Sequence, residues 1–182
     1  MKAMILSFSM LAIMMAVTNP SWGQGEAVMK LMLNSDAFQP GGEIPREFTC
    51  QGENKSPKLT LGGIPKKAKS LTLIMDDPDA PRGTWVHWVL YDLPPNTLEL
   101  PMGAGLQPGA EQGGMDGKND FGKQGYGGPC PPAGKAHRYF FKLYALDQKL
   151  GLKQGASKDD LERAMQGHIL AQAELMGTYQ RR

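Results

Sequence analysis

The sequence has little of what marks several large protein classes. Beyond residue 23 it has no apolar run near the roughly 20 residues of a membrane-spanning helix, so we expect no transmembrane segment. Its 20 basic and 18 acidic side chains are interspersed, which leaves no basic surface for nucleic acid and no charged tail. It has no internal repeat and no low-complexity tract. We therefore expect neither an integral membrane protein nor a nucleic-acid-binding protein.

The first residues are typical of a secretory leader. Lys2 precedes an apolar stretch over residues 3–17, and Ser21-Trp-Gly23 has the small-x-small pattern of a cleavage site. The apolar stretch is too short to span a membrane. We predict a signal peptide over residues 1–23, cleaved after Gly23 or, as the alternative, after Ala27. The mature chain, residues 24–182, then forms one domain that is periplasmic or secreted.

Cysteine is scarce as well. The two cysteines, Cys50 and Cys130, do not have the Cys-x-x-Cys spacing of a redox or zinc site. An even number in an exported protein favours one disulfide, although two free thiols remain the alternative.

What the chain does contain is a series of short apolar runs separated by Gly and Pro. Residues 71–75, 85–91 and 139–146 are the strongest strand predictions. Residues 94–132 are rich in Gly and Pro with few apolar runs, which is more typical of a functional loop than of filler.

Helix is predicted only near the C-terminus. Ser157 is a good N-cap followed by acidic residues, and apolar positions then recur at helical spacing up to Met176, with Gly177 as the C-cap and Gly167 as a point where the helix can split. Short strands closed by helix predict a mainly β fold, an antiparallel β-sandwich with peripheral C-terminal helices.

The first candidate group of functional residues lies between two strong strands. Asp77 and Asp79 follow residues 71–75 in a turn made rigid by proline. His87 lies within residues 85–91, a strand whose two faces are both apolar. A buried imidazole needs a partner, because an unpaired buried polar group costs ~1–3 kcal/mol. Taken alone, His87 is more often a structural histidine than a ligand.

A second group resembles the first. The Gly- and Pro-rich residues 125–134 lead to His137 and Tyr139 at the start of an aromatic strand. Alternation puts His137, Tyr139 and Phe141 on one face of that strand. It likewise puts Trp85, His87 and Val89 on one face of theirs. If both strands end at the same edge, they form one small site with Asp77 and Asp79, whose carboxylates are expected to raise the pKa of a neighbouring imidazole.

Other motifs fail on inspection. Asp120-Phe-Gly122 looks like the magnesium motif of kinases, but no His-Arg-Asp loop precedes it. The turn at Asp77 lacks the Gly and Glu of a calcium loop. The two His and two Asp have no metal-ligand spacing. We predict no metal and no cofactor.

With these residues in view, nearly the whole mature chain resembles the phosphatidylethanolamine-binding proteins, in their bacterial Raf-kinase-inhibitor-like branch. The motifs that carry the resemblance are Ser35-Asp-Ala-Phe38, Phe48-Thr-Cys-Gln-Gly52, Ser56-Pro57, Asp76-Asp-Pro-Asp-Ala-Pro81, Trp85-Val-His-Trp88, Asn119-Asp-Phe-Gly122, Gly125-Tyr-Gly-Gly-Pro129, His137-Arg-Tyr139, Gly167-His-Ile-Leu170 and Glu174-Leu-Met-Gly-Thr-Tyr179. The sequence departs from the usual pattern at Lys58 and Leu61, away from these motifs.

The resemblance implies a Greek-key β-sandwich with a small anion site at one end, which accepts phosphate, acetate or a phosphorylated head group. It implies that this site is formed by Asp77, Asp79, His87, His137 and Tyr139, with Trp85, Gly127 and Gly128 on its rim.

The leading interpretation is an exported, non-enzymatic module that binds a small anion or a phospholipid head group and modulates a partner protein. One alternative is an inhibitor of an extracytoplasmic protease or other enzyme. Another is a phosphoester-processing enzyme that uses the Asp/His site for acid–base chemistry. The natural ligand, the protein partner and a homodimeric state are left open.

Overall fold

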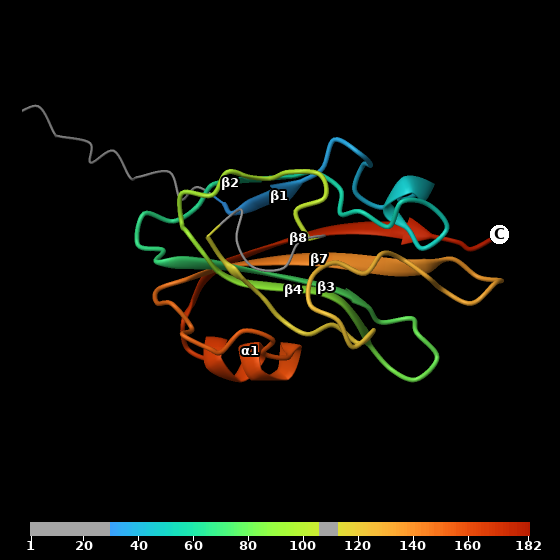
Figure 1. The fold of residues 1–182 in the computed structure, drawn as a ribbon. Coiled ribbons are helices and arrows are strands. Elements are labelled where there is room, and N and C mark those ends of the chain that lie inside the picture. The colour runs from blue at the N-terminus through green and yellow to red at the C-terminus, as the bar shows by residue number, and fades with distance from the viewer. Residues whose placement is uncertain (1–29, 106–112) are drawn as a thin grey trace, which may run out of the picture.

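The computed structural model describes residues 30–105 and 113–182, so the predicted leader lies outside the described residues. Two antiparallel sheets form two layers, and one helix lies against the larger sheet (Figure 1). The smaller sheet has the order β1-β2-β5 and the larger β6-β4-β3-β7-β8. The elements are β1 Met32–Asn34, η1 Arg46–Phe48, β2 Leu59–Gly62, β3 Ser70–Asp77, β4 Trp85–Leu93, β5 Glu99–Leu100, β6 Met115–Asp116, β7 His137–Leu146, α1 Lys158–Met165 and β8 Ile169–Tyr179.

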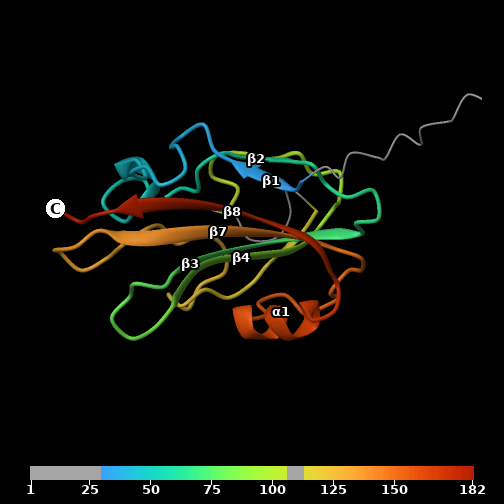
Figure 2. The ribbon, with the colours of Figure 1, turned by 180° about the vertical axis from the view of Figure 1, so that it is seen from behind.

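Within the larger sheet, β3 and β4 are buried on both faces because each face has its own covering layer there. Toward the smaller sheet, Leu73 and Trp88 belong to the main core. Toward α1, Val89 packs in a second apolar cluster that includes Leu161 and Met165 of the helix. The view from behind shows α1 on the side of this sheet away from β1 and β2 (Figure 2). The predicted mainly β sandwich is therefore confirmed, as is the two-sided burial of the strand after Asp79.

The helix predicted to run as far as Met176 is wrong beyond residue 165. Gly167 adopts a left-handed φ of 79°, and the chain then turns into β8. Two patterns overlap here, since Leu161 and Met165 follow helical spacing whereas Leu175 and Tyr179 are buried on the alternating face of a strand. Pairing with β7 along the length of β8 satisfies the backbone and outweighs the local helical pattern.

A β-bulge at His87 changes which side chains share a face of β4. Met75 pairs with Trp88, but Asp76 pairs with Val86, so His87 is the extra residue on its strand. His87 contacts Tyr139 on the inner side, and Val89 packs toward α1. The predicted common face of Trp85, His87 and Val89 is therefore wrong at Val89.

The alternation predicted for His137, Tyr139 and Phe141 is confirmed, since all three are buried while Arg138 between them is exposed.

The predicted bond between Cys50 and Cys130 is present, with the two Cα atoms 5.4 Å apart. The backbone N–H of Cys50 also donates to the carbonyl of Pro129, 3.1 Å away. The turn after η1 is thus fixed to the loop that precedes His137. Of the described helices, none is both long and apolar enough to cross a bilayer.

Replacing both cysteines, Cys50→Ser with Cys130→Ser, should lower the free energy of unfolding by about 4 kcal/mol. The bridge joins residues 80 positions apart and so restricts the unfolded chain. Urea denaturation of the variant, compared with oxidised and reduced wild type, measures this effect. Reduced wild type should match the variant, and equal midpoints for all three proteins would contradict the expectation.

Candidate functional site

Asp77 is the carboxylate at the centre of the site. It is the last residue of β3 and only 3% exposed. Its Oδ2 accepts a hydrogen bond of 2.8 Å from Nδ1 of His137, and its Oδ1 accepts one of 2.8 Å from the backbone N–H of Asp79. The proline after Asp77 ends the strand and starts the turn that supplies the second donor. Both carboxylate oxygens are therefore engaged, and the buried charge is compensated.

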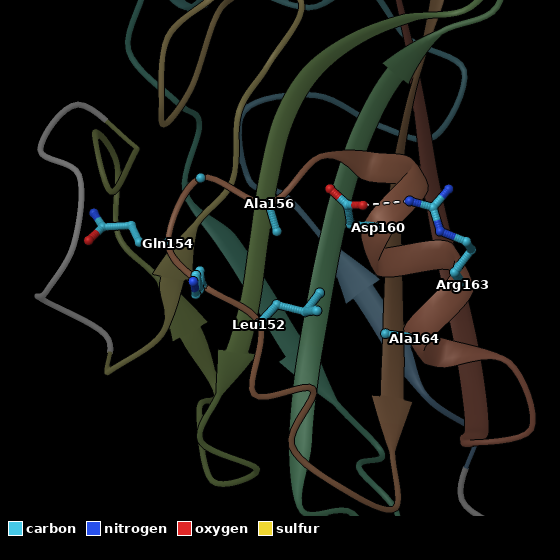
Figure 3. A pocket seen from close by; sticks show the side chains of 8 residues that line it. Leu152, Gln154, Ala156, Asp160, Arg163 and Ala164 are labelled. Carbon is cyan, nitrogen blue, oxygen red and sulfur yellow. Dashed lines mark hydrogen bonds and ion pairs between the residues drawn. The ribbon is translucent and has the colours of Figure 1, made fainter.

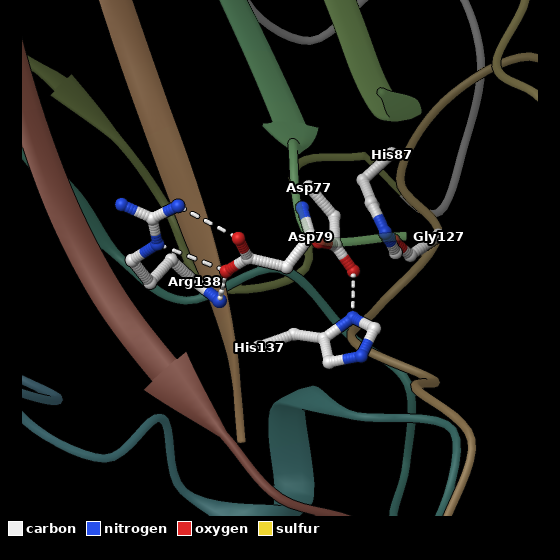
Figure 4. Close-up of polar contacts among 6 residues, drawn as sticks. All are labelled: Asp77, Asp79, His87, Gly127, His137 and Arg138. Atoms are coloured by element: carbon white, nitrogen blue, oxygen red, sulfur yellow. Dashed lines mark hydrogen bonds and ion pairs between the residues drawn. The ribbon is translucent and has the colours of Figure 1, made fainter. Parts of the chain in front are cut away.

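His137 receives its orientation from this contact. It is the first residue of β7 and is buried, and its Nδ1 faces the Asp77 carboxylate (Figure 4). An ionised carboxylate only accepts, so Nδ1 is the donor. With Nδ1 fixed in this way, the neutral ring carries a lone pair on Nε2, and the protonated ring carries a second N–H there.

His87 is held by backbone instead of a carboxylate. Its Nδ1 donates to the carbonyl oxygen of Gly127 at 2.6 Å, so its Nε2 has the same two options. Burial lowers the pKa of His87, and the carbonyls of Gly127 and Gly128 with the charge of Asp77 oppose this only in part. The expected upward pKa shift from a neighbouring carboxylate is thus wrong for His87, because desolvation of a ring that is 2% exposed outweighs it.

Tyr139 supplies a buried hydroxyl. Its side chain is fully buried, and within the described part of the chain no group stands at full hydrogen-bond geometry to its OH, although the Asp77 carboxylate is near enough to interact with it. The ring meets the His87 ring edge-on with centroids 5.2 Å apart. Burial first, and then the negative charge of Asp77, raises the pKa of the Tyr139 phenol far above its usual range. The group is therefore a neutral O–H donor at physiological pH.

Asp79 is predicted for the site, but in the structure its carboxylate binds Arg138. The guanidinium donates from Nε at 2.9 Å and from Nη2 at 2.7 Å, and the Arg138 backbone N–H adds a third bond at 2.9 Å. These contacts hold the pKa of Asp79 at about 2. Figure 4 shows Asp79 turned toward Arg138 while Asp77 faces His137. Asp79 therefore braces the turn, and Arg138 is a partner that the sequence did not reveal.

The rim glycines are required by close approach of neighbouring atoms. A Cβ on Gly127 would lie 2.5 Å from the Phe121 ring, and one on Gly128 would lie 2.3 Å from the Phe48 carbonyl oxygen. The N–H of Gly128 donates to Asn54 Oδ1 at 2.8 Å. A side chain at either position would push away the loop that holds His87.

Phe121 covers the site and was missed from the sequence. Its ring contacts Trp85 and His87 edge-on, with centroid distances of 5.5 and 5.3 Å. Asn119 shapes this loop by accepting from the N–H groups of Phe121 and Lys123. The sequence feature that could have identified Phe121 is the motif Asn119-Asp-Phe-Gly122. From the sequence, this motif was only rejected as a kinase motif or counted toward the family resemblance.

Two hollows lie elsewhere, and none of the residues predicted for the site lines either of them. One, of about 570 Å³, lies between residues 152–156 and α1 (Figure 3). The other, of about 330 Å³, is lined by residues after β1 and at the end of β8, among them Tyr179. No group of three or more potential metal ligands comes together in the described ranges.

Acidification should destabilise the fold partly through His87. Its folded pKa lies below the 6.5 of an ordinary imidazole, so between the two values the unfolded chain binds a proton that the folded chain does not. The stability that His87 contributes is full above pH 6.5 and is lost as the pH falls through its folded pKa. Thermal unfolding between about pH 7.5 and 5 measures this loss.

His87→Gln should show a smaller drop in Tm over that range than wild type. His168→Gln is the matched control, since His168 is only half-buried and bonds Asp147 at the far end of the sheet. An equal drop in wild type and His87→Gln would contradict the assignment.

Comparison with known sequences identifies the family. The sequence model of the phosphatidylethanolamine-binding proteins matches residues 34–180. Two similar proteins, each named only UPF0098 protein, come from Methanothermobacter thermautotrophicus and Aquifex aeolicus. The first is 50% identical over 149 residues, covering 82% of this chain and 98% of the relative. The second is 50% identical over 166 residues, covering 86% and 91%.

Two solved structures are also similar. A phosphatidylethanolamine-binding protein homologue from Chlamydia trachomatis has a TM-score of 0.78 and 43% identity, covering 85% of this chain and 99% of its own. YbcL of E. coli, described as a member of the mammalian family, has a TM-score of 0.78 and 32% identity, covering 84% and 99%. With the match extending from β1 to the end of β8, this chain belongs to the phosphatidylethanolamine-binding protein family.

Proposed function

We propose that this protein binds a small oxyanion, such as phosphate, a phosphorylated head group or a carboxylate, at His87, His137 and Tyr139. The observation that carries the proposal is the hydroxyl of Tyr139, which is buried against His87 and has no partner at full hydrogen-bond geometry among the described residues. A buried hydroxyl without a partner costs ~1–3 kcal/mol, and a ligand oxygen would remove that cost.

The two imidazoles define which protonation state of the ligand fits. Each uses Nδ1 for a fixed contact, to Gly127 or to Asp77, which leaves Nε2 for a ligand. Because burial lowers the pKa of His87, its Nε2 is a hydrogen-bond acceptor near neutral pH. A phosphate monoanion has an O–H to donate there and other oxygens to accept from Tyr139. A carboxylate has no proton to offer, so it needs the protonated ring.

The proposal is binding without turnover, and it is supported by how the potential catalytic groups are used. Asp77 is held by two donors, and Asp79 is held by Arg138. Both cysteines are in the disulfide, so neither is available as a nucleophile. What supports the proposal is a set of fixed donors and acceptors around one neutral hydroxyl.

Tyr139→Phe should weaken phosphate binding at least tenfold, about 1.4 kcal/mol, without destabilising the fold. Among residues 30–105 and 113–182 no group stands at full hydrogen-bond geometry to the hydroxyl, so its removal should leave Tm unchanged or raise it. Isothermal titration calorimetry with inorganic phosphate gives the affinity, and calorimetric unfolding gives Tm. His168→Gln serves as the control that keeps full affinity.

Two results would contradict the proposal. One is unchanged phosphate affinity in Tyr139→Phe. The other is steady hydrolysis of a phosphomonoester by wild type that is lost in His87→Gln, which would favour the enzymatic alternative.

We also propose that the protein is exported and works outside the cytosol. The disulfide between Cys50 and Cys130 supports this, because such bonds persist in oxidising compartments. Expression of the full chain in a bacterium, followed by N-terminal sequencing of the periplasmic fraction, should give a start at Gln24, or at Val28 if cleavage follows Ala27. An unprocessed chain confined to the cytosol would contradict the proposal.

A further inference from the structure

The smaller hollow lies beside the proposed anion site. Tyr179, which lines the hollow, pairs directly with His137 across β7 and β8. Directly opposite residues in antiparallel strands project to the same face, with Cβ atoms roughly 5 Å apart. A residue that lines the hollow, Tyr179, is therefore the direct cross-strand neighbour of His137, an imidazole of the proposed site.

Gln51 organises the hollow before any ligand arrives. Its Oε1 accepts from the Tyr179 hydroxyl at 2.6 Å, and its Nε2 donates to the backbone oxygen of Arg182 at 3.1 Å. Its backbone oxygen accepts from Nε of Arg46 at 3.0 Å. The neighbouring residue, Cys50, is held by the disulfide. A cavity built in this way loses little freedom when it binds.

The charged side chains that line the hollow are two guanidiniums and one carboxylate. Arg46 and Arg182 line it, and neither forms an ion pair with any carboxylate of residues 30–105 or 113–182. Arg46 uses only Nε for Gln51, so its terminal N–H groups are available in the planar arrangement that suits a carboxylate. Glu43 is the one acidic residue in the lining.

The larger hollow lacks this property. The guanidinium of Arg163 in its lining already donates to Asp160 at 2.5 Å (Figure 3). Asp160 also completes the capping box of α1 with the N-cap residue Ser157. Lys153 is the remaining cation in that lining. The larger hollow also lies on the α1 side of the sheet, whereas Tyr179 and His137 belong to the inner side.

We propose that the smaller hollow is a second anion subsite, and that the ligand class is a phosphorylated hydroxy acid. Its phosphate occupies the site at His87, His137 and Tyr139, and its carboxylate is bound by Arg46 and Arg182. The inference rests on the proposed function and goes further, because it assigns the organic part of the ligand. A neutral head group would leave both guanidiniums without an anion.

Two matched ligand pairs test the subsite, each an acid and the alcohol that replaces its carboxylate by CH2OH. The short pair is 3-phosphoglycerate and glycerol 3-phosphate, and the long pair is 6-phosphogluconate and sorbitol 6-phosphate. Calorimetric titration at about 0.15 M salt limits unspecific attraction. At least one acid should bind about tenfold more tightly than its alcohol, a difference of 1.4 kcal/mol.

Arg46→Gln and Arg182→Gln should each reduce that preference at least threefold while leaving the affinity for inorganic phosphate unchanged. Lys153→Gln removes a charge from the other hollow and should change neither quantity. An equal loss of acid preference in Lys153→Gln would overturn the subsite and indicate general electrostatic attraction.

The remaining outcomes separate the two proposals. If wild type binds phosphate but neither acid better than its alcohol, the subsite is wrong and the anion site stands. If wild type does not bind phosphate at all, the proposed function is wrong and the subsite falls with it.

Discussion

The structure depends on how it compensates two consecutive buried carboxylates at the end of β3. Successive residues of a strand face opposite sides of a sheet, so Asp76 and Asp77 need separate partners. Asp76, fully buried on the outer side, lies 2.9 Å from the ammonium groups of Lys142 and Lys158. Asp77, on the inner side, pairs with His137. Burying a charge without a partner costs several kcal/mol, so both faces are constrained at this point.

Each of these pairs also positions something larger. Lys158 is the first residue of α1, so its bond to Asp76 fixes the start of the helix against the outer face of the sheet. The bond of Asp77 to His137 fixes the imidazole at the inner edge, where the proposed ligand would lie. A change at the end of β3 would therefore affect helix docking and site geometry together.

The inner edge is built as much by backbone as by side chains. The bulge in β4 turns His87 inward, and the carbonyl of Gly127 fixes the ring. Gly128 lets the same loop approach the turn after η1, and the disulfide closes that approach covalently. The same loops and strands thus hold both the proposed anion site and the hollow at Tyr179. They also shield His87 from water, and this burial lowers its pKa.

The sequence by itself determined the parts that follow from local chemistry. Strongly apolar runs predicted β3, β4 and β7, and the prolines after Asp77 predicted the rigid turn. Both features depend on residues that are close together in the sequence. The pairing of Cys50 with Cys130 was also predicted, since two cysteines allow one bond. Only tertiary structure decided that residues 169–179 form a strand, because pairing with β7 outweighs a helical pattern. The bulge at His87 and the ion pair between Asp79 and Arg138 were likewise decided by tertiary structure. Both depend on which residues of another strand lie opposite.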